Sequence, residues 1–181
     1  FFRSSPEVET PDLQLVFVVG IVDDHSRKMH LGHGFSCHVD VIRPHSRGSV
    51  KLAGPEVRTA PLIDPNFLGD ERDLDLLVKG VQIQQTIIES QPFDAIRGKM
   101  LYPVDKNDKA AIAADIRRRA DTQYHPVGTC KMGPASDPTD SPTCTQRFTH
   151  HANDLGTPME VALPPLNGCF SSSLFKCMYA V

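Results

Sequence analysis

Residues 70–90 constrain the fold most, because their apolar side chains cover too much of a helix to be left in water. These side chains recur with helical period and form one broad stripe: Leu74, Leu77, Val78, Val81 and Ile88, widened by Leu76, Ile83 and Ile87. Asp70 suits the N-cap position, and Pro92 ends the element. Glu71 and Asp73 suit the positive end of the helix dipole. A face this broad needs a sheet to cover it, so we expect the helix to pack across strands.

Three segments upstream of this helix have the period of two that is typical of strands. Residues 12–22 alternate, with one strongly apolar face. In residues 35–42 we expect the two faces to differ: Phe35, Cys37, Val39 and Val41 toward the core, and Ser36, His38 and Asp40 toward the outside. Residues 49–52 resume a short strand after a turn at 44–48, which predicts a hairpin. The predicted fold class is therefore α+β, a mostly antiparallel sheet with helices packed on one face.

Prolines and a second helix follow these strands. Pro55, Pro61 and Pro65 predict an extended connector before the long helix. The second helix is predicted over 110–120, with a cap among Asp105, Asn107 and Asp108 and a buried stripe of Ile112, Ala113, Ile116 and Ala120. Three arginines at its end, residues 117–119, favour the helix dipole and are expected to be solvated. This helix delivers the chain directly into Tyr124 and His125.

Composition and charge exclude several classes of protein. The 181 residues are 40% apolar and 23% charged, which is ordinary for a globular domain and unlike a disordered chain. A net charge of -3 gives no reason to expect a nucleic-acid partner. No apolar run approaches the ~20 residues of a membrane span. Five cysteines, an odd number with no CxxC pair, fit a reducing compartment. We expect a cytoplasmic location, with the mitochondrion as the alternative.

A motif near residue 125 carries most of the information about function. His125 follows the second helix, and Pro126 restricts it to extended conformations. Gly128 and Gly133 allow the chain to pass close to another surface or a flat ligand. An imidazole held in this way suits proton transfer, because histidine exchanges a proton near neutral pH. The alternative is a structural or solvent-facing histidine.

The segment ADTQYHPVGTCKMG, residues 120–133, resembles the signature of the C-terminal region of glucose-methanol-choline (GMC) oxidoreductases, and specifically the choline dehydrogenase-like enzymes. The resemblance includes PDLQLVFV, GHGFSCHVDVIRPHSRGSVKLA and APLIDPNFL, in the family's order. It implies that residues 1–138 are the substrate-binding region of such an enzyme. Residues 139–181 do not match the family and are broken by prolines, so we expect an irregular tail.

In the family that this chain resembles, FAD oxidises a small alcohol at its CH–OH group. The histidine of the matching motif lies beside the flavin and takes the hydroxyl proton, and this role is carried over to His125 alone. His150, His151, Asn153 and Asn167 lie outside the family's motifs and receive no role. The second catalytic residue and the FAD-binding residues are not identified.

The family's glycine-rich FAD-binding motif, GxGxxG, does not occur in these residues. The sequence also starts without methionine. We therefore expect a fragment that lacks the N-terminal FAD-binding domain and is inactive alone. A non-catalytic fragment or binding module is the alternative function. A metal-binding or hydrolytic protein using His30, His33, Cys37 and His38 is the remote alternative, since neighbouring strand residues such as Cys37 and His38 point to opposite faces.

Overall fold

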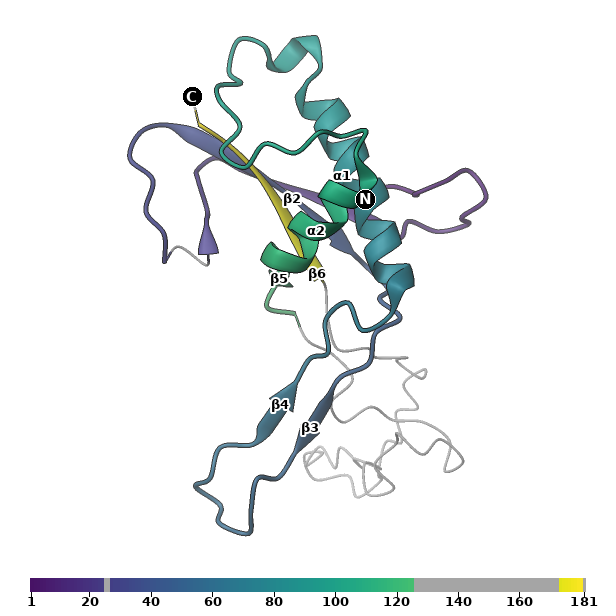
Figure 1. The fold of residues 1–181 in the computed structure, drawn as a ribbon, viewed down its shortest axis with the longest axis vertical. Coiled ribbons are helices and arrows are strands. Elements are labelled where there is room, and N and C mark those ends of the chain that lie inside the picture. Colours follow the sequence, from purple (N-terminus) through teal and green to yellow (C-terminus); the bar gives the residue numbers. More distant parts are fainter. Residues whose placement is uncertain (25–26, 126–172, 181) are drawn as a thin grey trace, which may run out of the picture.

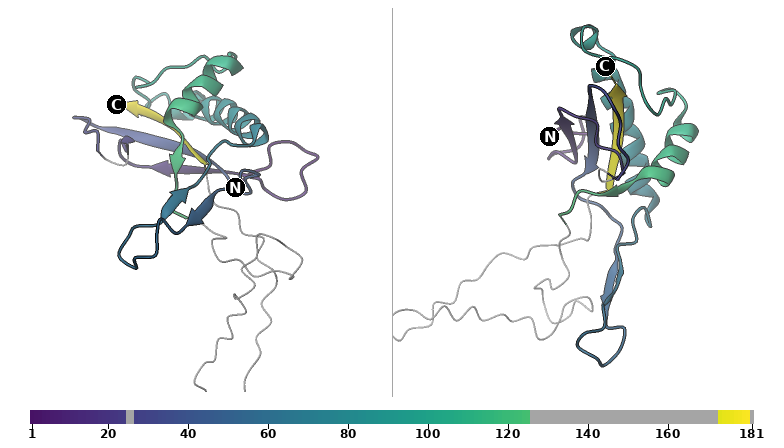
Figure 2. Two further views of the ribbon diagram at one scale, coloured as in Figure 1. Left: turned by 60° about the horizontal axis from the view of Figure 1, so that its bottom comes forward. Right: turned by 90° about the vertical axis from the view of Figure 1, so that its left-hand side faces the viewer.

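A four-stranded antiparallel sheet carries two helices on one face (Figures 1 and 2). The computed structural model describes residues 1–24, 27–125 and 173–180. In chain order the elements are β1 (Leu13–Val18), β2 (Gly34–Val41), β3 (Ser49–Lys51), β4 (Leu62–Asp64), α1 (Glu71–Ile88), the short 3₁₀ helix η2 (Gln91–Phe93), α2 (Lys109–Arg119), β5 (Asp121–Thr122) and β6 (Ser173–Ala180). The sheet order is β1-β2-β6-β5, and β3 and β4 form a separate pair. The predicted α+β class is confirmed.

Helix α1 packs on the β1–β2 hairpin, as the broad apolar stripe predicted. The hairpin register runs from Leu13 opposite Val41 to Val18 opposite Ser36. The stripe of α1 is buried with its strand partners in one core: Leu13, Phe35, Cys37, Val39, Val41, Leu74, Leu77, Val78, Val81, Ile88, Ile112 and Ile116. Gly80 lies where the helix approaches the sheet most closely, because a Cβ there would meet the side chain of Val39 at 2.6 Å. The predicted N-cap is also correct, since the Asp70 carboxylate accepts the backbone N–H of Arg72 at 3.0 Å.

The polar residues of β2 are not exposed, contrary to the expectation. Ser36, His38 and Asp40 have relative exposures of 0%, 5% and 3%. Ser36 shows one reason: its hydroxyl donates to the Gly20 carbonyl and accepts the Val22 N–H, both at 2.9 Å. An alternating pattern assigns residues to the two faces of a strand, but it does not predict whether the more polar face is exposed to solvent. β2 is a central strand, paired on both edges, and residues on both of its faces are buried.

The predicted hairpin between residues 35–42 and 49–52 does not form. β3 pairs instead with β4, which comes from the proline-marked connector, in the register Ser49–Asp64, Val50–Ile63 and Lys51–Leu62. The edge of β2 that the hairpin would have used pairs with β6. Figure 1 shows β3 and β4 projecting away from the main sheet.

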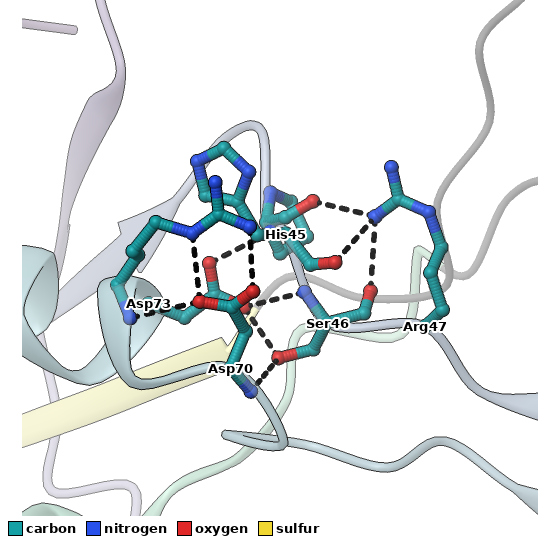
Figure 3. Close-up of polar contacts among 7 residues, drawn as sticks. His45, Ser46, Arg47, Asp70 and Asp73 are labelled. Atoms are coloured by element: carbon teal, nitrogen blue, oxygen red, sulfur yellow. Dashed lines mark hydrogen bonds and ion pairs between the residues drawn. The ribbon is translucent and has the colours of Figure 1, made fainter.

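A buried carboxylate explains why the chain turns away from β2. Asp73, in the first turn of α1, is fully buried and accepts three hydrogen bonds (Figure 3). They come from the His45 N–H at 2.7 Å, the Ser46 N–H at 2.8 Å and the Ser46 hydroxyl at 2.5 Å. The same hydroxyl accepts the Asp70 N–H at 3.1 Å. We call these contacts the Asp73 clamp. They tie the loop after β2 to the start of α1, so the chain cannot fold straight back along β2.

We expect Asp73→Asn to lower the free energy of unfolding by about 2–3 kcal/mol. The amide keeps one acceptor oxygen and places an N–H₂ group against buried donors, so charge-assisted bonds are lost. Urea denaturation measures the change. Asp75→Asn, at an exposed position of the same helix, is the matched control and should shift stability by less than about 0.5 kcal/mol. Equal losses in the two variants would show that the clamp does not hold the loop.

The expectation of an irregular tail is wrong for residues 173–180, and residues 139–172 lie outside the described residues. β6 pairs antiparallel with β2 from Gly34 opposite Ala180 to Asp40 opposite Leu174, and it also pairs with β5. Only Phe175 and Tyr179 of the segment SLFKCMYA are residue types that favour strands, so local propensity does not explain this strand. An open edge of β2 leaves backbone donors and acceptors without partners, and this segment supplies them. Residues 173–180 do not match the family's motifs, yet they form a strand, so the lack of a match was not a valid reason to expect irregular structure.

Candidate functional site

The candidate site begins where α2 ends. The helix is capped by Asp108, whose carboxylate accepts the Ala111 N–H at 2.9 Å, and Ile112 and Ile116 bury its inner face. β5 follows after a single residue and pairs with the start of β6. Three residues later the chain reaches His125, which is exposed. The predicted delivery of His125 by this helix is thus confirmed.

Two side-chain contacts hold the residues just before His125. The Gln123 amide donates to the Asp40 carboxylate on β2 at 3.1 Å, which ties this segment to the buried centre of the sheet. The Tyr124 N–H donates to the Thr122 hydroxyl at 2.9 Å. Tyr124 has φ +66°, a left-handed conformation that costs a non-glycine residue roughly 1 kcal/mol. The chain therefore makes a defined, slightly strained turn that presents an exposed tyrosine and an exposed imidazole next to each other.

A charged network supports the root of this segment at the end of α2. Asp115 has a side chain only 3% exposed and forms ion pairs with Arg118 and Arg119. The Arg119 guanidinium lies over the Tyr102 ring, 4.5 Å from its centroid. The Tyr102 hydroxyl donates to Asp23 at 2.7 Å. The arginines expected to be simply solvated are therefore partly structural.

Asp23 also contacts His30, whose Nε2 lies 2.8 Å from the carboxylate. Burial acts to raise the pKa of Asp23, but hydrogen bonds from Tyr102 and His30 outweigh it and bring that pKa below its ordinary value. The same hydrogen bond raises the pKa of Tyr102. Asp23 is thus an anion near neutral pH, and Tyr102 remains a neutral hydrogen-bond donor.

A cavity of about 200 Å³ lies beside this network. It is lined by Asp23, Asp24, Lys28, Arg118, Arg119, Ala120 and Asp121. Ligand pockets for drug-sized molecules usually measure ~300–1,000 Å³. The cavity is therefore too small for a dinucleotide such as FAD, and its charged lining does not suit a flat aromatic ring.

The Asp115 network predicts a specific loss of stability in acid. Burial acts to raise the pKa of Asp115, but hydrogen bonds from Arg119 and Arg118 outweigh it and hold that pKa below its ordinary value. A depressed folded-state pKa gives stability that is present above the unfolded value of ~3.9 and is lost as pH falls through the folded value. We expect Asp115→Asn to cost about 2 kcal/mol at pH 7 and progressively less below about pH 4.

Urea denaturation of both proteins at several pH values between 7 and 2.5 measures this difference. Asp94→Asn is the control, because Asp94 pairs with Arg97 at 2.6 Å but is 58% exposed. A surface pair of this kind is worth roughly 0–1 kcal/mol. A constant difference between wild type and Asp115→Asn across this range would contradict the assignment.

The other candidate site and metal-ligand residues do not form a second site in the part of the chain that the structure describes. Residues 126–133, the wall of the motif, and His150, His151, Asn153 and Asn167 lie outside the described residues. His30 contacts Asp23, while Cys37 and His38 are buried on β2. In the described part of the chain no group of three His, Cys, Asp or Glu residues is arranged to hold a metal ion. Burial raises the pKa of the Cys37 thiol, so this cysteine is a core residue and a poor nucleophile.

Sequence reasoning missed the residues that support His125. Asp115 lies three and four residues before two arginines on a helix, a spacing that does predict ion pairs. Contacts between residues far apart in the chain had no local signal: Gln123 with Asp40, and Tyr102 with Asp23, are separated by 83 and 79 residues.

Comparison with known proteins defines the class. The GMC oxidoreductase family model, which describes the C-terminal domain, matches residues 44–151. The chain is 40% identical over 141 residues to alcohol dehydrogenase [acceptor] of Pseudomonas putida, covering 75% of this chain and 25% of that protein. It is 39% identical over 141 residues to the mitochondrial choline dehydrogenase of Mus musculus, covering 77% and 24%. It is 33% identical over 140 residues to oxygen-dependent choline dehydrogenase of Rhizobium etli, covering 76% and 25%.

This chain belongs to the GMC oxidoreductase family. It spans about a quarter of the length of the curated relatives that it matches. The resemblance inferred from the motifs is confirmed. Among the residues that the structure describes, no helix is both long and apolar enough to cross a bilayer.

Proposed function

We propose that this chain is the substrate-binding and catalytic-base region of an FAD-dependent dehydrogenase that oxidises a small alcohol, with His125 as the base. Family membership supports the reaction class. The observation that carries the residue assignment is the placement of His125: it is exposed, and Asp40 and Thr122 hold the segment just before it. Side chains that serve only to fill a core are not presented in this way.

The proposed reaction removes two hydrogens from a CH–OH group. The neutral imidazole of His125 accepts the hydroxyl proton, which leaves an alkoxide whose carbon is a far better hydride donor than the alcohol. FAD, when bound, would supply the acceptor for that hydride. The alcohol becomes the carbonyl compound, and the protonated His125 returns its proton to solvent. A positioned base contributes typically ~10²–10⁴-fold to such a step.

The residues at the end of α2 fit a surface that faces a flavin and do not fit a pocket that holds one. Tyr124 and His125 are both exposed, which allows them to approach a group carried by another part of the enzyme. The sequence has no glycine-rich dinucleotide turn, and the cavity at the end of α2 is too small. We therefore assign FAD binding to an N-terminal domain outside this chain and expect the chain alone to be catalytically inactive.

The second candidate is a non-catalytic fragment or binding module, and one observation favours it as a description of the chain by itself. The chain spans only about a quarter of its relatives. The flavin absorbance spectrum of a longer enzyme that contains this region distinguishes the two, because both candidates expect no flavin on the chain alone. We expect no flavin to co-purify with the chain and a full flavin complement in a longer enzyme that contains it.

In a full-length enzyme that contains this region, we expect His125→Ala to slow flavin reduction by the alcohol at least ~10²-fold. Substrate affinity and flavin content should change much less, because the imidazole acts after binding. His125→Asn should also be slow, since it keeps some hydrogen bonding without useful basicity. The defect should decrease at high pH, where solvent hydroxide partly replaces the base. Stopped-flow absorbance of the flavin measures these rates.

His33→Ala is the matched control for this substitution. His33 is also exposed, but it lies in the loop between β1 and β2, remote in sequence from the motif. We expect its rate to equal that of wild type. Equal flavin-reduction rates in wild type and His125→Ala would remove the residue assignment and leave family membership intact.

A further inference from the structure

The two-stranded projection formed by β3, β4 and their connection, residues 49–64, is the most exposed part of the fold. We call it the arm. Every residue from 50 to 64 is exposed except Gly54, which is half-buried. Figures 1 and 2 show the arm extending away from the sheet and from both helices. An isolated pair of strands is marginally stable in water, so this arrangement suggests a partner surface.

The two faces of the arm differ in polarity. Val50 lies directly opposite Ile63 in the register, so their side chains share one face, and Leu52 continues that face by alternation. Val50, Leu52 and Ile63 are 39%, 88% and 61% exposed. The opposite face carries the pair Lys51 and Leu62 and the pair Ser49 and Asp64. One face is therefore wholly aliphatic and the other is mixed, as in a strand pair with one side buried.

The base of the arm is fixed to the core. The Asp73 clamp holds residues 45 and 46 just before β3. Beyond β4, the Asn66 side-chain amide donates to the Arg47 carbonyl at 2.9 Å and closes the base. Gly48 packs so closely on Asp64 and Pro65 that a Cβ would collide with their backbone. The arm thus leaves the domain in a set direction, which lowers the ordering cost of docking.

We propose that the arm is an intramolecular docking element, and that its Val50–Leu52–Ile63 face binds the remaining part of the same polypeptide in the full-length enzyme. Two observations identify this occupant. The chain spans only about a quarter of the relatives it matches, so a full-length family member has a large further part. The arm also lies inside the family match at residues 44–151, which makes it part of the family's domain and not of the divergent tail.

Position in the fold supports the same occupant. The arm leaves β2 after Val41, and Asp40 at that end pairs with Leu174, which pairs in turn with Asp121 of β5. The arm and the segment leading to His125 therefore emerge from the same end of the sheet. One body that covers this end can touch both.

A second copy of the chain fits the aliphatic face less well. A stable interface between separate molecules buries ~800 Å² and involves ~20–30 residues on each side. Three aliphatic side chains fall far short of that size. A part of the same polypeptide is already tethered, so a small apolar contact suffices as one portion of a larger interface.

The test uses a full-length enzyme that contains this region and compares Ile63→Glu with Leu62→Glu. These neighbours are 61% and 59% exposed and lie on opposite faces of the arm, so they form a matched pair. We expect Ile63→Glu to lower the thermal denaturation midpoint by about 4–8 °C, because it buries a carboxylate against an apolar surface. Leu62→Glu should shift it by about 1 °C or less. Size-exclusion mass should be the same in both variants and in wild type.

Hydrogen exchange of wild-type protein gives a second measurement that needs no variant to fold. Backbone amides of residues 50–52 and 62–63 should exchange at least ~10-fold more slowly in the full-length enzyme than in this chain. Equal exchange rates, or equal midpoints for the two variants, would overturn the proposal. A halved mass for Ile63→Glu with an unchanged midpoint would overturn it in favour of a second copy. None of these readouts depends on the role of His125, so the two proposals fail separately.

Discussion

The packing of α1 on β2 is the contact on which the rest of the described fold depends. Leu77 and Val81 of the helix and Val39 and Leu13 of the hairpin are all fully buried. Burying one such side chain is worth about 1.5–3 kcal/mol. Gly80 adds to this contact by having no side chain, since a methyl group there would press on Val39. A helix glycine normally costs about 1 kcal/mol relative to alanine, a cost that the closer approach of helix and sheet offsets.

The candidate site follows from the central position of β2. Because residues on both faces of β2 are buried, the carboxylate of Asp40 lies inside the domain and accepts the Gln123 amide from below the surface. Before this segment, Asp115 orders the last turn of α2 through its ion pairs with Arg118 and Arg119. The exposed His125 is therefore carried by a segment with two internal attachments. An exposed position on a backbone with internal contacts suits the proposed base, which must meet the substrate in a set geometry.

The elements that sequence predicted well are those whose signal is local. The stripe of α1, the Asp70 cap and the two alternating strands all rest on periods that the chain shows within about twenty residues. The pairing of β3 with β4 depends on Asp73. This carboxylate binds His45 and Ser46, which precede it in the chain by 28 and 27 positions. The sequence of the turn at 44–48 is compatible with both a hairpin and a loop held by Asp73, so it does not predict which one forms. The motif gave His125 its proposed role, but the contacts that hold its neighbours arise only when β2, α2 and β5 come together.

In the described domain, apolar side chains are covered on the face that carries the helices and are exposed at one end of the sheet. On the helix-covered face, apolar side chains from α1, α2 and both strands of the hairpin cover one another fully. At the end of β2 near Val41, the chain instead presents an aliphatic strand face in the arm and an aromatic–imidazole pair at Tyr124 and His125. A domain that folded only to be stable would gain nothing from exposing such groups to water. The same end that lacks cover therefore also carries the proposed base, His125. A polypeptide that docks on the arm would exclude water from the space beside His125 as it binds, and proton transfer is more strongly controlled in such a space.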